Sequence, residues 1–181
     1  MFDINTSRDL LNKLEADFED LKADPMSARH ALNAVVTAYH LHEWVWGEWL
    51  GTDFVTWKAI AGQDRTAKSE QQPIVIRDRD SFRRWLKDRC YWFEPMEELT
   101  NGSKHFARDG QSSTHVASRF GSGPYGLGPF HHSFLYVDLG ASKGVNDRYR
   151  TITRLIEDAV VFWRWFFDEY RPDHPQEQPG A

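Results

Sequence analysis

Residues 147–170 read DRYRTITRLIEDAVVFWRWFFDEY, and this stretch decides the fold class. Its apolar side chains recur every three or four residues, the period of an α-helix, at Ile152, Ile156, Ala159, Val160, Trp163 and Phe167. Leu155, Phe162 and Phe166 widen that apolar face, so we expect this helix to pack against more than one neighbour. Asp147 is a suitable N-cap residue. The stretch therefore predicts a long, largely buried last helix.

Two helices are predicted in the N-terminal part of the chain. The first is expected to start after Thr6, which forms a capping-box pattern with Asp9. The second is expected to start at Asp24-Pro25, with the aspartate as N-cap and the proline in the first turn. It should end near Gly51, because glycine is typical of helix C-termini.

The middle of the chain predicts two shorter helices. Asp80 is a suitable N-cap for a third helix, and Pro95 marks the start of a fourth. The single cysteine, Cys90, excludes an intrachain disulfide and is expected to be a small buried apolar residue. The segment from Phe54 to Trp57 fits either a short helix or an anchored loop.

The remaining segments complete the predicted architecture. Residues 108–132 are rich in glycine and serine and predict a long loop, and residues 133–139 have the composition of a strand or a small hairpin. We therefore predict a mainly α fold: an up-and-down bundle of four or five helices, with a long Gly-rich loop and a small β-hairpin before the last helix. Residues 1–171 should form a single domain, followed by a disordered tail at 172–181.

Composition narrows the classes of function. The chain has 181 residues, of which 40% are hydrophobic and 27% charged, as in globular domains. Aromatic residues make up 14%, and most fall at helical spacing, which favours core packing over a binding surface. The net charge of -5 argues against a strong global attraction to nucleic acid but allows a local basic patch. No leader or membrane-length apolar run is seen, so we expect a cytoplasmic protein with no membrane association.

A first polar cluster interrupts the second predicted helix at Asn33, Thr37, His40 and Trp44. Helical geometry places Asn33 and His40 almost two whole turns apart, hence on one face. Two interpretations remain open: a structural hydrogen-bond network between helices, or a wall of a binding site formed by Asn33 and His40. His42 points nearly opposite His40 and is expected to face solvent.

A second polar cluster lies in the fourth predicted helix at Asn101, Lys104 and His105. An imidazole can act as general acid or base near neutral pH, a lysine can stabilise a phosphate, and an amide can orient either one. The trio therefore fits phosphate binding or phosphodiester cleavage. The alternative is a helix C-terminus, where lysine and histidine are favoured by the helix dipole alone.

The third predicted helix is locally basic. Arg83 and Arg84 are the candidates for RNA or phosphate contact, although a solvated helix face is the usual explanation of such a run.

No cofactor is expected, because the G-x-G-x-x-G match at residues 121–126 is interrupted by Pro124 and has neither a preceding strand nor a following helix. A metal site built from His40, His105 and a loop histidine is a third alternative, but its spacing fits no known metal motif.

The segment from Leu99 to Phe106 resembles the motif of the helical HEPN superfamily, in which an arginine is followed by a polar residue and, a few positions on, by a histidine. In the resemblance, Asn101 and His105 take the polar and histidine positions. The position five before His105 is Thr100 instead of arginine, and Lys104 is expected to supply the cation. The resemblance implies a four- or five-helix bundle, commonly dimeric, in toxin–antitoxin and phage-defence systems, often with metal-independent endoribonuclease activity.

Two hypotheses about function follow. The first is a HEPN-like RNA-processing or RNA-binding protein, with His105 as general acid or base and the RNA 2′-hydroxyl as nucleophile. RNA, a second copy of the chain, and a cognate antitoxin or defence-system partner would be its partners. The second is a non-enzymatic interaction or ligand-sensing module, whose polar clusters are structural or hold a ligand.

Overall fold

The computed structural model describes residues 3–63, 75–103, 113–117, 134–139 and 148–171. The elements in these ranges are α1 (Ser7–Ala23), α2 (Ala28–Glu48), the 3-10 helix η1 (Leu50–Thr52), α3 (Phe54–Gln63), α4 (Arg79–Arg89), α5 (Phe93–Ser103), β1 (Ser113–Ala117), β2 (Phe134–Asp138), β3 (Tyr149–Thr151) and α6 (Ile152–Tyr170). The predicted mainly α class with a small antiparallel sheet before the last helix is confirmed.

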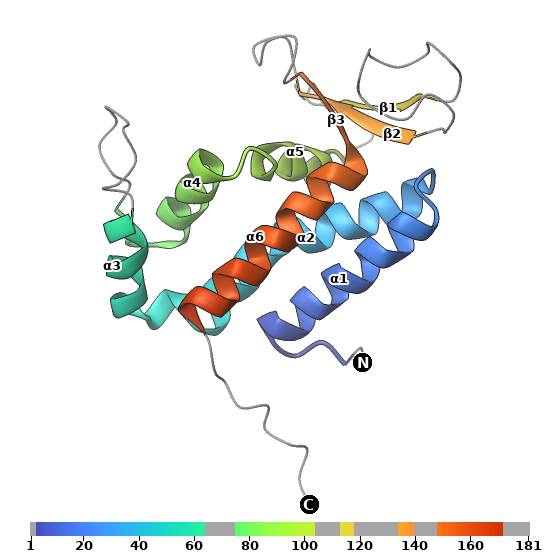
Figure 1. Ribbon diagram of the computed structural model, residues 1–181. Helices are drawn as coiled ribbons and strands as arrows, with labels where there is room; N and C mark the ends of the chain where they lie inside the picture. Colours follow the sequence, from blue (N-terminus) through green and yellow to red (C-terminus); the bar gives the residue numbers. More distant parts are fainter. Residues whose placement is uncertain (1–2, 64–74, 104–112, 118–133, 140–147, 172–181) are drawn as a thin grey trace, which may run out of the picture.

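The long helices α1, α2 and α6 lie side by side and form the centre of the fold (Figure 1). Helix α5 packs on α2, and α4 contacts both. The short helix α3 follows η1 at the end of the bundle away from the sheet (Figure 1). Segment 54–57, for which a helix and a loop were both open, is therefore helical.

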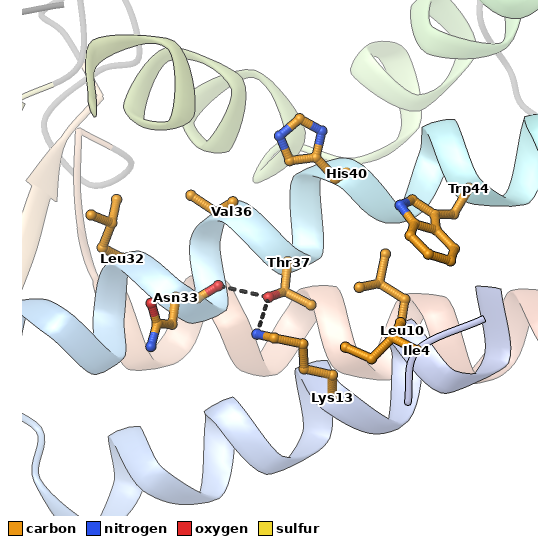
Figure 2. Close-up of a pocket in the computed structure, with 9 residues that line it drawn as sticks. All are labelled: Ile4, Leu10, Lys13, Leu32, Asn33, Val36, Thr37, His40 and Trp44. Carbon is orange, nitrogen blue, oxygen red and sulfur yellow. Dashed lines mark hydrogen bonds between the residues drawn. The ribbon is translucent and has the colours of Figure 1, made fainter. Parts of the chain in front are cut away.

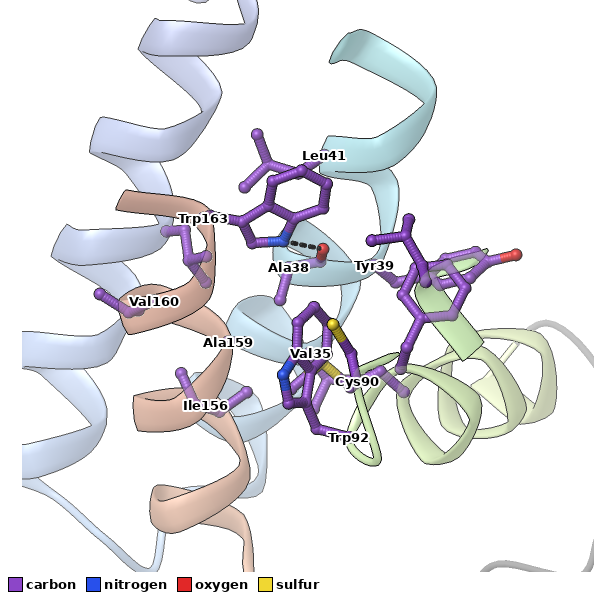
Figure 3. Close-up of a cluster of buried hydrophobic side chains, with 14 of the residues drawn as sticks. Val35, Ala38, Tyr39, Leu41, Cys90, Trp92, Ile156, Ala159, Val160 and Trp163 are labelled. Atoms are coloured by element: carbon purple, nitrogen blue, oxygen red, sulfur yellow. Dashed lines mark hydrogen bonds between the residues drawn. The ribbon is translucent and has the colours of Figure 1, made fainter. Parts of the chain in front are cut away.

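Figure 3 shows the part of the core where α6 meets α2 and the start of α5, and buried side chains of α1 and α4 continue it. Trp163 is fully buried, and its Nε1–H donates to the carbonyl oxygen of Ala38 at 3.2 Å. The indole can approach that carbonyl because Ala38 and Ala159 have small side chains, both fully buried at the contact between the helices. Cys90 is buried, as predicted. Of the eight tryptophans, only Trp44 and Trp165 are exposed, at 36% and 41%, and the others lie in the core or pack against it.

The helix starts follow local capping, and one of the predicted caps is confirmed. Thr6 and Asp9 form the predicted capping box of α1. The prediction that Asp24 caps α2 is wrong, because Asp24 ends α1 with its own N–H bonded to the carbonyl of Asp20. Ser27 caps α2 instead, accepting from the N–H of His30.

The caps of α4 and α6 also differ from the prediction. Asp78 caps α4 through a capping box with Ser81, which leaves Asp80 in the first turn. Helix α5 begins at Phe93, so Pro95 lies inside its first turn. Thr151 caps α6, four residues beyond the predicted Asp147, because β3 occupies the residues before it.

The sheet has the order β1-β2-β3, and both strand pairs are antiparallel. Strand β1 lies inside residues 108–132, so the prediction of one long loop there is wrong at 113–117. Its extended backbone is stabilised by pairing with β2, a long-range contact that local composition does not reveal. The rest of that segment and the predicted tail at 172–181 lie outside the described residues.

Candidate functional site

A pocket of about 510 Å³ lies between α1 and α2 (Figure 2). All four residues of the first polar cluster line it: the structure brings together Asn33, Thr37, His40 and Trp44. The N-terminal segment and α1 supply the opposite wall with Ile4, Leu10 and Lys13, and Leu32 and Val36 complete the α2 wall. We refer to this pocket, defined by these nine residues, as the α1–α2 groove.

The polar floor of the groove is a network that joins the two helices. The Lys13 Nζ donates to Asp17 Oδ2 at 2.5 Å and to Thr37 Oγ1 at 2.8 Å. The Thr37 hydroxyl lies 2.8 Å from both Asp17 Oδ2 and the carbonyl oxygen of Asn33, and it can donate its single hydrogen to either one. For Thr37, the structural interpretation of the first cluster is therefore the correct one. The exposed amide of Asn33 takes no part in this network.

The two ends of the α1–α2 groove are apolar and open to solvent. Leu32 is 43% exposed at one end, and Trp44 is 36% exposed at the other. Figure 2 shows the Trp44 indole on the same side as Ile4 and Leu10, whereas Leu32 lies beside Asn33. These apolar ends thus flank the polar network.

His40 lies at the rim of the groove, with its ring turned away from Lys13 (Figure 2). Its Nδ1 is 2.9 Å from Glu43 Oε2, one turn along the same helix. Burial opposes ionisation of Glu43, but the hydrogen bond from His40 and the neighbouring charges prevail and lower the pKa of this carboxyl. His40 is therefore held at the rim by an acidic neighbour.

The prediction that His42 faces solvent is wrong, because its side chain is buried. Its Nδ1–H donates to the carbonyl oxygen of Tyr39 at 2.5 Å. Its ring packs nearly perpendicular to the ring of Phe93 from α5, with 5.1 Å between ring centroids. Burial lowers the pKa of His42, so the imidazole is neutral in the folded protein at neutral pH. Helix α5 thus covers the α2 face that carries His42.

A buried carboxylate, Glu97 of α5, links three helices. Its Oε1 accepts from the Tyr39 hydroxyl of α2 at 3.0 Å, and its Oε2 lies 2.6 Å from Lys87 Nζ of α4. Arg83 of α4 forms a further ion pair with Oε1. Burial, together with the negative charge of Glu97, raises the pKa of Tyr39 to about 12. We call Tyr39, Arg83, Lys87 and Glu97 the Glu97 cluster; the sequence did not predict it.

The predicted binding residues Arg83 and Arg84 do not share a site. The Arg83 guanidinium is bonded to Glu97, whereas Arg84 is exposed. Neighbouring positions on a helix point about 100° apart, so one of them faces α5 while the other points to solvent. The basic face of α4 is thus partly neutralised by a carboxylate from α5.

The second polar cluster is described only in part. Asn101 is partly exposed in the last turn of α5, one turn beyond Glu97, whereas Lys104 and His105 lie outside the described residues. Along α5, Phe93 meets His42 and Glu97 meets Tyr39, so the two helices run in opposite directions. Asn101 therefore lies level with the N-terminal half of α2, but the structure does not bring it together with Asn33, which lines the α1–α2 groove on another face of that helix.

The other sequence-based alternatives find no support in the described ranges. No three histidine, cysteine, aspartate or glutamate side chains there come together in an arrangement that could hold a metal ion. Residues 121–126, His131 and His132 lie outside those ranges. None of the described helices combines the length and the apolar character needed to cross a membrane.

No protein-family model, curated protein or solved structure matches this chain.

Proposed function

We propose that this chain is an interaction module that binds a partner at the α1–α2 groove. One observation carries the proposal: Leu32 and Trp44, two large apolar side chains, are exposed at opposite ends of one groove with polar residues between them. Large apolar side chains that stay exposed along one groove mark a candidate binding surface. An exposed tryptophan is also a common energetic centre of interfaces.

Site-specific photo-crosslinking tests this function. A photoreactive amino acid at position 32 should give a crosslinked adduct in cells, and Trp44→Ala should abolish that adduct. The matched control is the same amino acid at position 161, since Val161 is 60% exposed on α6, outside the groove. An adduct at position 161 of equal yield, or an adduct at position 32 that persists in Trp44→Ala, would contradict the proposal.

A second candidate function is HEPN-like RNA binding or metal-independent RNA cleavage, in a homodimer regulated by an antitoxin or another defence-system protein. It is supported by the second polar cluster at the end of α5, where Asn101 is partly exposed, whereas Asn33 lies on a different face of α2, in the α1–α2 groove. In this proposal Lys104 steadies the phosphate and His105 is the general acid or base. The RNA 2′-hydroxyl loses its proton and attacks the adjacent phosphorus, and the 5′-oxygen of the next nucleotide takes up a proton and leaves, which gives a 2′,3′-cyclic phosphate.

The two candidates differ in one assay. Purified protein and its His105→Ala variant are incubated with labelled single-stranded RNA, with and without EDTA. Cleavage that survives EDTA and disappears in His105→Ala supports the ribonuclease. Intact RNA in every lane, with Trp44-dependent crosslinking at position 32, supports the interaction module. Cleavage that needs a divalent ion contradicts the metal-independent mechanism.

A further inference from the structure

The α2 wall of the α1–α2 groove is a ridge that runs obliquely across the helix surface. Leu32, Val36, His40 and Trp44 follow one another at intervals of four residues, so they form a single ridge. Leu32 and Trp44 are 12 residues apart, which corresponds to about 18 Å along an α-helix. An occupant that contacts both exposed ends must therefore span roughly three helical turns.

The walls of the groove favour a helical occupant over an extended one. Both walls come mainly from α-helices, whose backbone groups are bonded within their own helix, so they offer no edge for strand addition. An extended peptide lying there would find no backbone partner on either wall, so its N–H and C=O groups would stay bonded to water and limit its apolar contact with the groove. A helix satisfies these groups internally.

The charges at the groove disfavour RNA at this particular surface. Lys13 is the one lining residue with a permanent positive charge, and its Nζ is already bonded to Asp17 and Thr37. Binding of a phosphate backbone depends on several free cationic side chains. The charge of Asp17 is paired with Lys13, but Glu43 beside His40 keeps 42% of its side chain exposed, and the whole chain carries a net charge of -5.

We infer that the α1–α2 groove binds an amphipathic α-helix of a partner protein, with an apolar stripe facing Leu32, Val36 and Trp44 and basic side chains along its flanks. This inference rests on the proposed interaction function and names the partner's chemistry. The apolar stripe supplies most of the affinity, because it covers the exposed ends of the groove. The basic flanks speed association with this acidic chain, so binding should weaken as salt is added.

A synthetic peptide tests the inference directly. The probe is a fluorescein-labelled helical peptide of 14 residues, with leucine at alternating three- and four-residue intervals, lysine on both flanks and alanine elsewhere. Comparison peptides have the same composition in scrambled order, or glutamate in place of lysine, and a labelled oligouridylate tests RNA at the same surface. Fluorescence anisotropy with the full chain gives each dissociation constant. We expect the striped lysine peptide to bind roughly tenfold or more tightly than the scrambled one.

Variants locate the binding site on the protein. Trp44→Ala and Leu32→Gln should each weaken binding of the striped peptide by roughly tenfold. Trp165→Ala and Val161→Gln are matched controls, because both residues are exposed on α6 at 41% and 60%. Thermal unfolding of each variant tests whether the fold is kept. If Trp44→Ala is destabilised, the Leu32→Gln variant provides the test of the binding site.

Three results would overturn the inference: equal binding of the scrambled peptide, no effect of Trp44→Ala or Leu32→Gln, or binding of oligouridylate alone. Nile red, an apolar dye, separates this failure from failure of the proposed function. If Nile red binds in a Trp44-dependent way while the striped peptide does not bind, the helical occupant is wrong and the groove remains a binding site. If neither binds and crosslinking at position 32 is independent of Trp44, both proposals fail.

Discussion

Replacing Glu97 with alanine removes the carboxylate on which α2, α4 and α5 converge. The side chain accepts from the Tyr39 hydroxyl and pairs with both Arg83 and Lys87. Removing one member of a buried ion pair typically costs about 3–5 kcal/mol. Arg83 and Lys87 keep 39% and 32% of their side chains exposed, so they can regain water when the partner is lost. We therefore expect a loss near the lower limit, about 3 kcal/mol in the free energy of unfolding.

The effect of Glu97→Ala should depend on pH. Burial opposes ionisation of Glu97, but the hydrogen bond from Lys87 and the charges of Arg83 and Lys87 prevail and lower its pKa below the usual 4.5. A carboxyl whose pKa is lowered on folding stabilises the protein fully above its unfolded-state pKa, and this contribution is lost as the pH falls through the folded-state value. The difference between wild type and variant should thus be largest at neutral pH and shrink below about 4.5.

Urea unfolding at neutral pH and at about pH 3.5 measures both quantities. Glu94→Ala is the matched control, because this glutamate is 54% exposed in the same helix and lies 3.9 Å from the same Lys87. The control should change stability by less than about 0.5 kcal/mol. Equal losses in the two variants, or a Glu97→Ala loss that stays unchanged at acid pH, would refute the assignment of Glu97 as the charge that joins the three helices.

Three further outcomes follow from the core. Trp163→Ala should cost about 4 kcal/mol in urea unfolding, whereas Trp165→Ala, at a 41% exposed position, should cost less than half as much. Burial lowers the pKa of His42, so protonation of this imidazole favours the unfolded chain. In thermal melts, the wild-type protein should lose stability as the pH falls below about 6.5. The His42→Leu variant should lack this part of the pH dependence. Burial raises the pKa of the Cys90 thiol to about 12, so little reactive thiolate forms in the folded protein. Iodoacetamide should therefore alkylate Cys90 far more slowly in the native protein than in urea, as followed by mass spectrometry. Equal alkylation rates would contradict the burial of Cys90.

The fold class could be predicted because the helical period is a local signal. The apolar stripe that includes Trp163 identifies α6, and the Thr6–Asp9 pair marks the start of α1 without any knowledge of tertiary contacts. The exact start of α4 was harder to predict, because Asp78 and Asp80 are both suitable N-cap residues. Asp78 is the cap because Ser81, three residues later, completes a capping box with it. Strand β1 depends on pairing with β2, a contact between residues that are distant in the chain.

The candidate site could be predicted only as far as one helix defines it. Periodicity placed Asn33 and His40 on one face and His42 on another, but it could not show that α5 covers the face with His42. The same limit hid Glu97, whose partners come from α2 and α4. The one available signal was the run of cations on α4, and we interpreted it as a solvated or RNA-binding face instead of a set of counter-ions.

Thr151 has a mechanical consequence for the whole molecule. This residue ends β3, opposite Tyr136 of β2, and its hydroxyl also accepts from the N–H of Arg154 to cap α6. No connecting segment separates the strand from the helix, so the sheet is attached directly to a helix of the core. A force that pulls on the sheet should therefore load the first turn of α6 directly, and amide hydrogens of that turn should exchange together with those of β3.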